Sequence, residues 1–126
     1  MSEVKIELDE PTKLKWYKIV FQLKKQFGKK PDMNGLLFLI ALRELGTSRV
    51  LNKEEKMDAF HVATCKLLSY EGYYKYTHTD AEGWPHYELV SKPAFADLLS
   101  QEMLLRKLVV RYFDENELYE DWKQVI

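Results

Sequence analysis

The sequence has few cysteines, no long apolar run and no recognisable signal peptide. Its 126 residues include one cysteine, Cys65, so no disulfide can form within the chain, and this scarcity is typical of a reducing cytosol. The longest uninterrupted apolar run, residues 36–42, is too short to cross a bilayer. The first residues, MSEVKIELDEP, lack the apolar stretch of a signal peptide. We therefore expect a cytoplasmic protein that does not associate with membranes.

The chain also lacks an excess of charge of either sign. A formal net charge of −1 gives no overall attraction to nucleic acids, which makes a nucleic-acid partner a weak expectation. With 46% hydrophobic and 31% charged residues, the composition is that of an ordinary soluble protein, and the length suffices to bury a core. We expect a single domain over residues 1–126, with residues 1–10 loosely ordered.

The charges that are present are distributed unevenly. Residues 13–30 contain seven lysines and no acid, whereas residues 114–121 contain five acids and no base. Such polarity predicts either that the two segments lie near each other or that each faces a charged partner.

Motifs for catalysis, metals and nucleotides are scarce as well. The five glycines form neither GxGxxG nor GxxxxGK, and neither CxxC nor HExxH occurs. His61 and Cys65 have the i,i+4 spacing of metal ligands or of a base and its nucleophile, but two ligands are half a metal site. Cys65 is also expected in the middle of a helix, away from a helix N-terminus that would lower its pKa. We predict no catalytic residue, no metal and no cofactor, with Cys65 serving as a small apolar residue.

Helical periodicity and capping signals dominate what the sequence does contain. Pro11 suits the first turn of a helix, and Gly28 suits the position just past its end. Asp32 is a good N-cap, and Asn52 with Glu55 gives a capping-box-like start. The expected main helices cover residues 11–27, 33–45, 53–71 and 93–113, and a short carboxy-terminal helix follows Asp114, with Glu117 completing another capping box.

Most of these helices have one apolar face. The middle of the helix over residues 33–45, residues 36–42, is apolar all round, which is typical of a helix that is buried centrally or shared with a partner chain. The apolar positions of the other expected helices are Trp16, Ile19, Val20, Leu23 and Phe27; Met57, Phe60, His61, Thr64, Leu67 and Leu68; Phe95, Leu98, Leu99, Leu105, Leu108, Val109, Tyr112 and Phe113; and Leu118, Tyr119, Trp122, Val125 and Ile126.

A basic stripe lies opposite the apolar face of the first helix. It consists of Lys15, Lys18, Lys25 and Lys29, together with Gln22. One interpretation is a phosphate-binding face. The favoured interpretation is a solvated surface, because no arginine accompanies the lysines.

Residues 70–90 hold six of the seventeen aromatic side chains and the one convincing period-2 pattern. The pattern predicts a β-hairpin with residues 80–83 as its connection. The expected pairs are Thr79–Trp84, Tyr76–Tyr87, Lys75–Glu88 and Tyr74–Leu89. The face expected to pack inward is Tyr74, Tyr76, His78, Pro85, Tyr87 and Leu89, and the outer face carries Trp84 and His86. The candidate binding surface, or pocket under the hairpin, is formed by Trp84, His86, His78, Tyr74, Tyr76 and His61.

Two resemblances bear on function. A helix followed by Gly-Tyr-Tyr, a polar turn and Gly-Trp-Pro-His-Tyr-Glu-Leu resembles the recognition helix and wing of winged-helix DNA-binding proteins. That likeness implies DNA recognition by the third helix, yet the start of this helix mixes bases with acids and a seven-residue gap precedes it. The segments KLKWYKIVFQLKKQFG, DMNGLLFLIALRELG, KEEKMDAFHVATCKLLS and DAEGWPHYELV together look like a small, function-unassigned group of bacterial helical proteins.

The sequence thus predicts a mostly α protein (α+β by strict count), with four main helices, one β-hairpin between helices three and four, and a short carboxy-terminal helix. The leading functional hypothesis is a non-enzymatic protein-interaction or assembly domain, and a second copy of the chain is one candidate partner. Three features favour it: the all-round apolar helix, the apolar carboxy-terminal helix and the oppositely charged ends. A winged-helix-like DNA-binding regulator and an enzymatic or small-molecule pocket under the hairpin are the alternatives.

Overall fold

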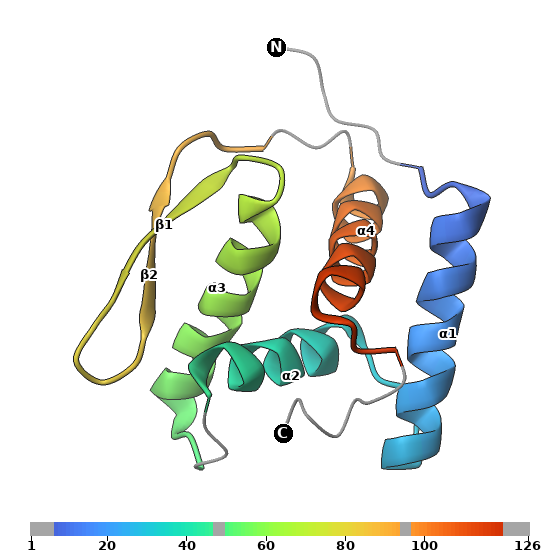
Figure 1. The fold of residues 1–126 in the computed structure, drawn as a ribbon, viewed down its shortest axis with the longest axis horizontal. Helices are drawn as coiled ribbons and strands as arrows, with labels where there is room; N and C mark the ends of the chain where they lie inside the picture. The colour runs from blue at the N-terminus through green and yellow to red at the C-terminus, as the bar shows by residue number, and fades with distance from the viewer. Residues whose placement is uncertain (1–6, 47–49, 94–96, 120–126) are drawn as a thin grey trace. The chain divides into compact units, whose positions relative to one another are not determined.

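A computed structural model of the chain describes residues 7–46, 50–93 and 97–119, and these residues form two compact units. Along the chain, one hairpin follows the third helix and precedes the fourth, which confirms the predicted mostly helical fold class (Figure 1). The prediction of a single domain stays a prediction. The first unit contains α1 (Glu10–Phe27) and α4 (Leu98–Asn116), and the second contains α2 (Met33–Leu45), α3 (Lys53–Ser69), β1 (Tyr74–Thr79) and β2 (Pro85–Leu89).

The ends of α1 are fixed by local hydrogen bonds. The side chain of Asp9, the N-cap, accepts a hydrogen bond from the backbone N–H of Thr12 at 2.9 Å, which satisfies one of the donors that a helix start leaves unpaired. Pro11 lies in the first turn, as predicted. Gly28 has a φ of 81° and donates its N–H to the carbonyl of Lys24, the left-handed ending that glycine adopts without strain.

In the first unit, α1 and α4 pack together. The predicted apolar face of α1 is confirmed at its four central positions, Trp16, Ile19, Val20 and Leu23, whereas Phe27 is exposed. The predicted inward positions Leu98 and Leu99 are wrong, because α4 begins only at Leu98 and both side chains of this first turn are exposed. The buried residues of α4 are Ser100, Leu104, Leu108, Val109, Val110, Tyr112 and Phe113.

The predicted start of α4 and the predicted carboxy-terminal helix fall partly outside the described residues. Phe95 lies in the undescribed range 94–96, and Trp122, Val125 and Ile126 lie in the undescribed range 120–126. Asp114, the expected N-cap, is instead inside α4, which continues to Asn116 and ends with Glu117 in a left-handed conformation. That end explains the difference, because the N–H of Glu117 bonds back to Asp114 and closes α4.

The basic and acidic ends of the sequence meet inside the first unit. Lys15 Nζ lies 3.1 Å from Asp114 Oδ2, and the ammonium of Lys18 lies 5.4 Å from the ring centroid of Tyr119. The prediction that the two charged segments lie near each other is therefore confirmed within one chain. Both ion-pair partners are partly exposed, so the pair is worth at most about 1 kcal/mol.

In the second unit, α3 is covered by α2 on one side and by the hairpin on another (Figure 1). Its start is the predicted capping box, in which Asn52 and Glu55 bond each other's backbone N–H. The predicted apolar stripe is wrong at Met57 and His61, which are exposed. Because α3 packs against two neighbours, its buried residues lie on more than one side of the helix. Small and large side chains are both among them: Ala59, Val62, Ala63, Cys65, Leu67 and Leu68.

The apolar helix α2 begins and ends where the sequence predicts. Asp32 accepts a hydrogen bond from the N–H of Gly35 at 2.7 Å, and Gly46 ends the helix in the left-handed conformation. Its buried residues are Leu36, Leu37, Ile40 and Ala41, and Phe38 meets Phe60 of α3 with ring centroids 6.1 Å apart. Among the described residues, no helix combines the length and the hydropathy that crossing a membrane requires.

Three of the four predicted pairs of the hairpin are present. The pairs Tyr74–Leu89, Lys75–Glu88 and Tyr76–Tyr87 are confirmed, but His78 then pairs with His86 and Thr79 with Pro85, so the expected Thr79–Trp84 pair is wrong. The shift lies between Tyr76 and His78 and leaves Thr77 as the extra residue of a β-bulge.

The faces of the hairpin also differ from the prediction. The bulge places His78 and His86 on the same face, where the sequence pattern put them on opposite faces. Of the six residues expected to pack inward, Tyr74, Pro85 and Tyr87 are half-buried, whereas Tyr76, His78 and Leu89 are exposed. Burial raises the pKa of the Tyr87 hydroxyl well above its usual value, with smaller contributions from Glu44 and other neighbours.

Candidate functional site

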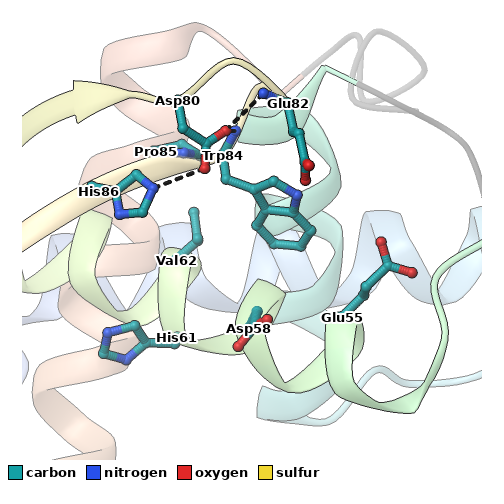
Figure 2. Close-up of a pocket in the computed structure, with 9 residues that line it drawn as sticks. All are labelled: Glu55, Asp58, His61, Val62, Asp80, Glu82, Trp84, Pro85 and His86. Atoms are coloured by element: carbon teal, nitrogen blue, oxygen red, sulfur yellow. Dashed lines mark hydrogen bonds and ion pairs between the residues drawn. The ribbon is translucent and has the colours of Figure 1, made fainter.

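A cavity of about 420 Å³ opens in the second unit, between α3 and the turn of the hairpin. Its α3 side begins in the first turns of the helix, and its opposite side is the turn together with the start of β2 (Figure 2). We call it the hairpin cavity. It is lined by Glu55, Asp58, His61 and Val62 from α3, and by Asp80, Glu82, Trp84, Pro85 and His86 from the hairpin.

Asp80 organises the turn. Its Oδ1 accepts hydrogen bonds from the backbone N–H groups of Glu82, at 2.9 Å, and Trp84, at 3.0 Å. Its Oδ2 accepts a third from Nε2 of His86 at 2.9 Å. One carboxylate therefore bonds both to the backbone at Trp84 and to the imidazole of His86. These bonds fix the turn in a conformation in which the indole of Trp84 points toward α3 (Figure 2).

These bonds predict an acid-sensitive turn. The hydrogen bond from His86, followed by the bond from the Trp84 backbone, lowers the pKa of Asp80 below its ordinary 3.8. A carboxyl group whose folded-state pKa is lowered contributes stability that is present above the unfolded-state value and is lost as pH falls through the folded-state value. The turn should therefore loosen below pH 3.8. The backbone amide shifts of Glu82 and Trp84 in an NMR pH titration measure this.

The matched variants for this prediction are Asp80→Asn and Asp58→Asn, each of which removes one carboxylate from the cavity lining. Asparagine at position 80 places an N–H₂ group where Oδ2 accepts from His86, so this variant should lose the low-pH transition at Trp84. Asp58→Asn should retain it. A transition that persists in Asp80→Asn would contradict the assignment.

The imidazole rings of His78 and His86, which lie on neighbouring strands of the hairpin, are stacked. Their ring centroids are 4.6 Å apart, with an interplanar angle of 3°. The bulge residue Thr77 supports the arrangement, because its hydroxyl donates to the backbone carbonyl of His86 at 3.1 Å and lies 3.0 Å from Nδ1 of His78. His86 is thus held by both Asp80 and Thr77, and only His86 of the two lines the cavity.

His61 and Cys65 do meet on α3. Nε2 of His61 lies 3.4 Å from Sγ of Cys65, and the imidazole also contacts the edge of Tyr74, with ring centroids 6.2 Å apart. Cys65 is fully buried, and burial raises the pKa of its thiol to about 11. Because the thiolate is the reactive form, this geometry disfavours Cys65 as a nucleophile at neutral pH.

Acidic side chains outnumber basic ones around the cavity. Four carboxylates face two imidazoles in the lining. Glu55 uses one oxygen on the backbone of Asn52, and Asp80 is committed to the turn. Asp58 and Glu82 form no side-chain hydrogen bond or ion pair with any residue that the structure describes. Figure 2 shows these carboxylates arranged around the indole of Trp84.

The structure brings together three of the six residues of the predicted binding surface. Trp84, His86 and His61 line the cavity, and His78 and Tyr74 each contact one of them. Tyr76 lies elsewhere, against Tyr87 and bonded to Thr79. Six lining residues are absent from the predicted binding surface, namely Val62, Pro85 and four acids. The local signal for the acids is the pair of acidic clusters in EEKMD and DAEGW: Glu55, Asp58, Asp80 and Glu82.

No metal-binding cluster accompanies these acids in the described part of the chain. Among residues 7–46, 50–93 and 97–119, no three or more histidine, cysteine, aspartate or glutamate side chains form a group that could hold a metal ion.

A second surface lies on α1 in the first unit. Leu14, Tyr17 and Phe21 are 68%, 63% and 64% exposed, and their i, i+3, i+7 spacing places them on one face of the helix. We call these three residues the α1 stripe. At 3.6 residues per turn, lysines flank the stripe on both sides: Lys13 and Lys24 on one, Lys18 and Lys25 on the other.

The predicted basic face is therefore not a continuous row of lysines. Lys15 pairs with Asp114, Lys18 lies over Tyr119, and the ammonium of Lys25 lies 5.6 Å from the ring centroid of Phe21. Lys29, the fourth lysine of the predicted basic face, lies beyond the last residue of α1. The α1 stripe was not predicted, although the spacing of Leu14, Tyr17 and Phe21 between lysines is visible in the sequence.

Comparisons with protein-family models, with curated proteins and with solved structures found no match for this chain.

Proposed function

We propose that this protein is a non-enzymatic protein-interaction module that docks a partner protein on the α1 stripe. The observation that carries the proposal is the exposure of Leu14, Tyr17 and Phe21, each more than 60% accessible on one helix face. Single exposed apolar side chains are common on protein surfaces, but large ones in a row are typical of interaction sites. Anchors at i, i+3 and i+7 are those of a helix that docks into an apolar groove.

The lysines beside the stripe indicate the chemistry of the partner. Lys13 and Lys24 on one side and Lys18 and Lys25 on the other complement a groove with acidic rims. The stripe of a second copy is a poor match, because two α1 helices would bring like charges together. The acidic end that might have compensated already pairs within the chain, through Lys15 and Asp114.

The alternative functions have weaker support. A winged-helix-like regulator needs a basic surface around the third helix and its wing, whereas the space between α3 and the hairpin turn is lined by four carboxylates that would repel phosphates. Of the residues predicted to line an enzymatic pocket under the hairpin, His61, Trp84 and His86 line the cavity. The separate pair of His61 and Cys65 is disfavoured as base and nucleophile, because burial raises the pKa of the thiol.

Site-specific photo-crosslinking tests the proposal. The photoreactive residue p-benzoylphenylalanine is introduced at position 17, within the stripe, or at position 26, which is exposed on another side of α1. Illumination of cells that make the protein should give one adduct of defined mass from position 17 and none from position 26. Mass spectrometry should identify a partner with an acidic surface, and the adduct yield should fall as salt is added to a lysate, because salt screens the flanking lysines.

Two outcomes would contradict the proposal. The stripe is not a docking face if position 17 gives no adduct above the level of position 26. The choice of partner is wrong if the purified protein alone gives an adduct of twice its own 15.0 kDa mass, because the partner would then be a second copy.

A further inference from the structure

We propose that the outer edge of β2, the edge that faces away from β1, pairs with the same edge of a second copy of this chain, so that the two hairpins form one continuous antiparallel sheet. This edge lies in the second unit and is independent of the α1 stripe and of its proposed function. Two observations carry the proposal: backbone groups of β2 that have no partner among the described residues, and charges along β2 that complement themselves in one register.

The hydrogen bonds of the hairpin show which backbone groups of β2 point away from β1. The N–H of Val90 bonds to the carbonyl of Tyr73 at 2.9 Å, so Val90 is directed inward, and this direction alternates along an antiparallel strand. Glu88 is therefore also directed toward β1. Tyr87 and Leu89 direct their N–H and C=O groups toward the outer edge.

These outward groups have no partner in the part of the chain that the structure describes. Among residues 7–46, 50–93 and 97–119, no backbone or side-chain group bonds to the outward N–H or C=O of Tyr87 or Leu89. Pro85 also faces outward, and it has no N–H to leave unpaired, which is where a strand tolerates proline. An edge with free N–H and C=O groups is a template for a further strand.

The outer edge of β2 is accessible within the second unit. Tyr74 is half-buried and its ring contacts the imidazole of His61 on α3, so α3 covers a face of the hairpin rather than the edge of β2. Leu89, on that edge, is 53% exposed. The edge of β1 is a poorer template, because it carries Lys75 and the bulge at Thr77, two features that protect strand edges.

The charges along β2 favour a second copy as the added strand. With a two-fold axis at Tyr87, His86 of each copy lies opposite Glu88 of the other, so an imidazole meets a carboxylate in both places. An axis at Glu88 would instead place two carboxylates opposite each other, which is destabilising. An axis at Leu89 would need the N–H of Ser91 to point outward, but that group already bonds to the residue before β1.

The register centred on Tyr87 also satisfies the unpaired backbone groups. The N–H of each Tyr87 bonds to the carbonyl of the other Tyr87, and the N–H of each Leu89 bonds to the carbonyl of Pro85 in the other copy. The interface consists of one short strand from each copy. Because so small an interface is weak, we expect self-association that depends on protein concentration.

Amide hydrogen exchange of the full chain, followed by NMR at low and at high protein concentration, tests the edge. The N–H groups of Tyr87 and Leu89 should become protected only at high concentration, whereas that of Glu88, which bonds inside the hairpin, should be protected at both. Light scattering should show a mass that rises from 15.0 kDa toward twice that value. The proposal is overturned if the chain stays monomeric, or if exchange at Tyr87 and Leu89 does not depend on concentration.

A mixture of isotope-labelled and unlabelled copies tests the register. We expect a nuclear Overhauser effect between the α protons of His86 in one copy and Glu88 in the other, because the two residues form a non-hydrogen-bonded pair, in which the backbones approach most closely. A dimer that lacks this contact would contradict the proposed pairing.

A matched pair of variants tests the role of the outward N–H. Leu89→Pro removes this group but no bond of the hairpin, and it should weaken self-association at least about tenfold, because each copy loses one hydrogen bond to the other. Leu89→Ala keeps the N–H and should associate within about threefold of the unmodified chain. Protection of the Glu88 N–H at low concentration verifies that the hairpin is intact in both. Equal self-association of the two variants, with intact hairpins, would also overturn the proposal.

Discussion

Replacing Phe113 by alanine should lower the free energy of unfolding by about 3–5 kcal/mol. Phe113 lies on α4 and is 1% exposed, and its ring contacts Tyr119 with a centroid distance of 5.8 Å. Truncation removes the whole buried ring and leaves a cavity that its neighbours can fill only in part. Urea denaturation followed by far-ultraviolet circular dichroism measures the change as a lower midpoint at an unchanged slope.

Phe21→Ala is the matched control, since it makes the same chemical change in the same unit. Phe21 is 64% exposed on α1, so its truncation should change the free energy of unfolding by no more than about 0.5 kcal/mol. A loss at Phe21 as large as the loss at Phe113 would mean that Phe21 belongs to a core, and the α1 stripe would then not be a free surface. A negligible loss at Phe113 would contradict the packing of the first unit.

The ends of α1 and α2 and the start of α3 could be predicted because the interactions that fix them are local. Asp32 bonds to the backbone three residues later, and Asn52 and Glu55 bond each other's backbone within one turn. Residue type alone signals these contacts. The proximity of the basic and acidic segments could also be predicted, as one of two alternatives, because the opposite charges are concentrated in two segments of the sequence.

The register of the hairpin could be predicted only as far as its alternating pattern holds. The pattern fixes the pairs from Tyr74 to Tyr76. Beyond them, the turn depends on the side chain of Asp80, which captures the backbone of Trp84, and the bulge at Thr77 takes up the extra residue. A period-2 pattern contains no information about a side chain that reorganises a turn.

The hairpin cavity could be predicted only in part, because it forms between distant segments. Trp84 and His86 could be predicted as binding residues because they lie in the aromatic-rich segment of residues 70–90. The carboxylates of Asp58 and Glu82 did not, since each has an ordinary local explanation, one near a helix start and the other in a polar turn. Only the packing of the hairpin on α3 brings them around one indole.

Replacing Tyr17 and Phe21 together by glutamate should weaken the affinity for the cross-linked partner by about 100-fold or more. Buried aromatic anchors at the centre of an interface commonly contribute 2 kcal/mol or more each when truncated, and about 1.4 kcal/mol corresponds to a tenfold change. Charged side chains at both positions would also face the acidic rims that the flanking lysines imply. Both residues are exposed, so the helix and the core should be unaffected.

Gln26→Glu is the control for the added charge. Residue 26 is exposed on α1 outside the stripe, so this variant should bind within about threefold of the unmodified protein, which is the range expected when only long-range electrostatics change. Circular dichroism spectra and urea midpoints of all three proteins should agree within error, which separates lost docking from lost folding.

Isothermal titration calorimetry of the purified partner with these three proteins measures whether the α1 stripe is the docking face. We expect one saturable binding event for the unmodified protein and for Gln26→Glu, and no measurable heat of binding for Tyr17→Glu/Phe21→Glu at the same concentrations. Equal affinity of all three proteins would contradict the claim that Tyr17 and Phe21 form the docking face.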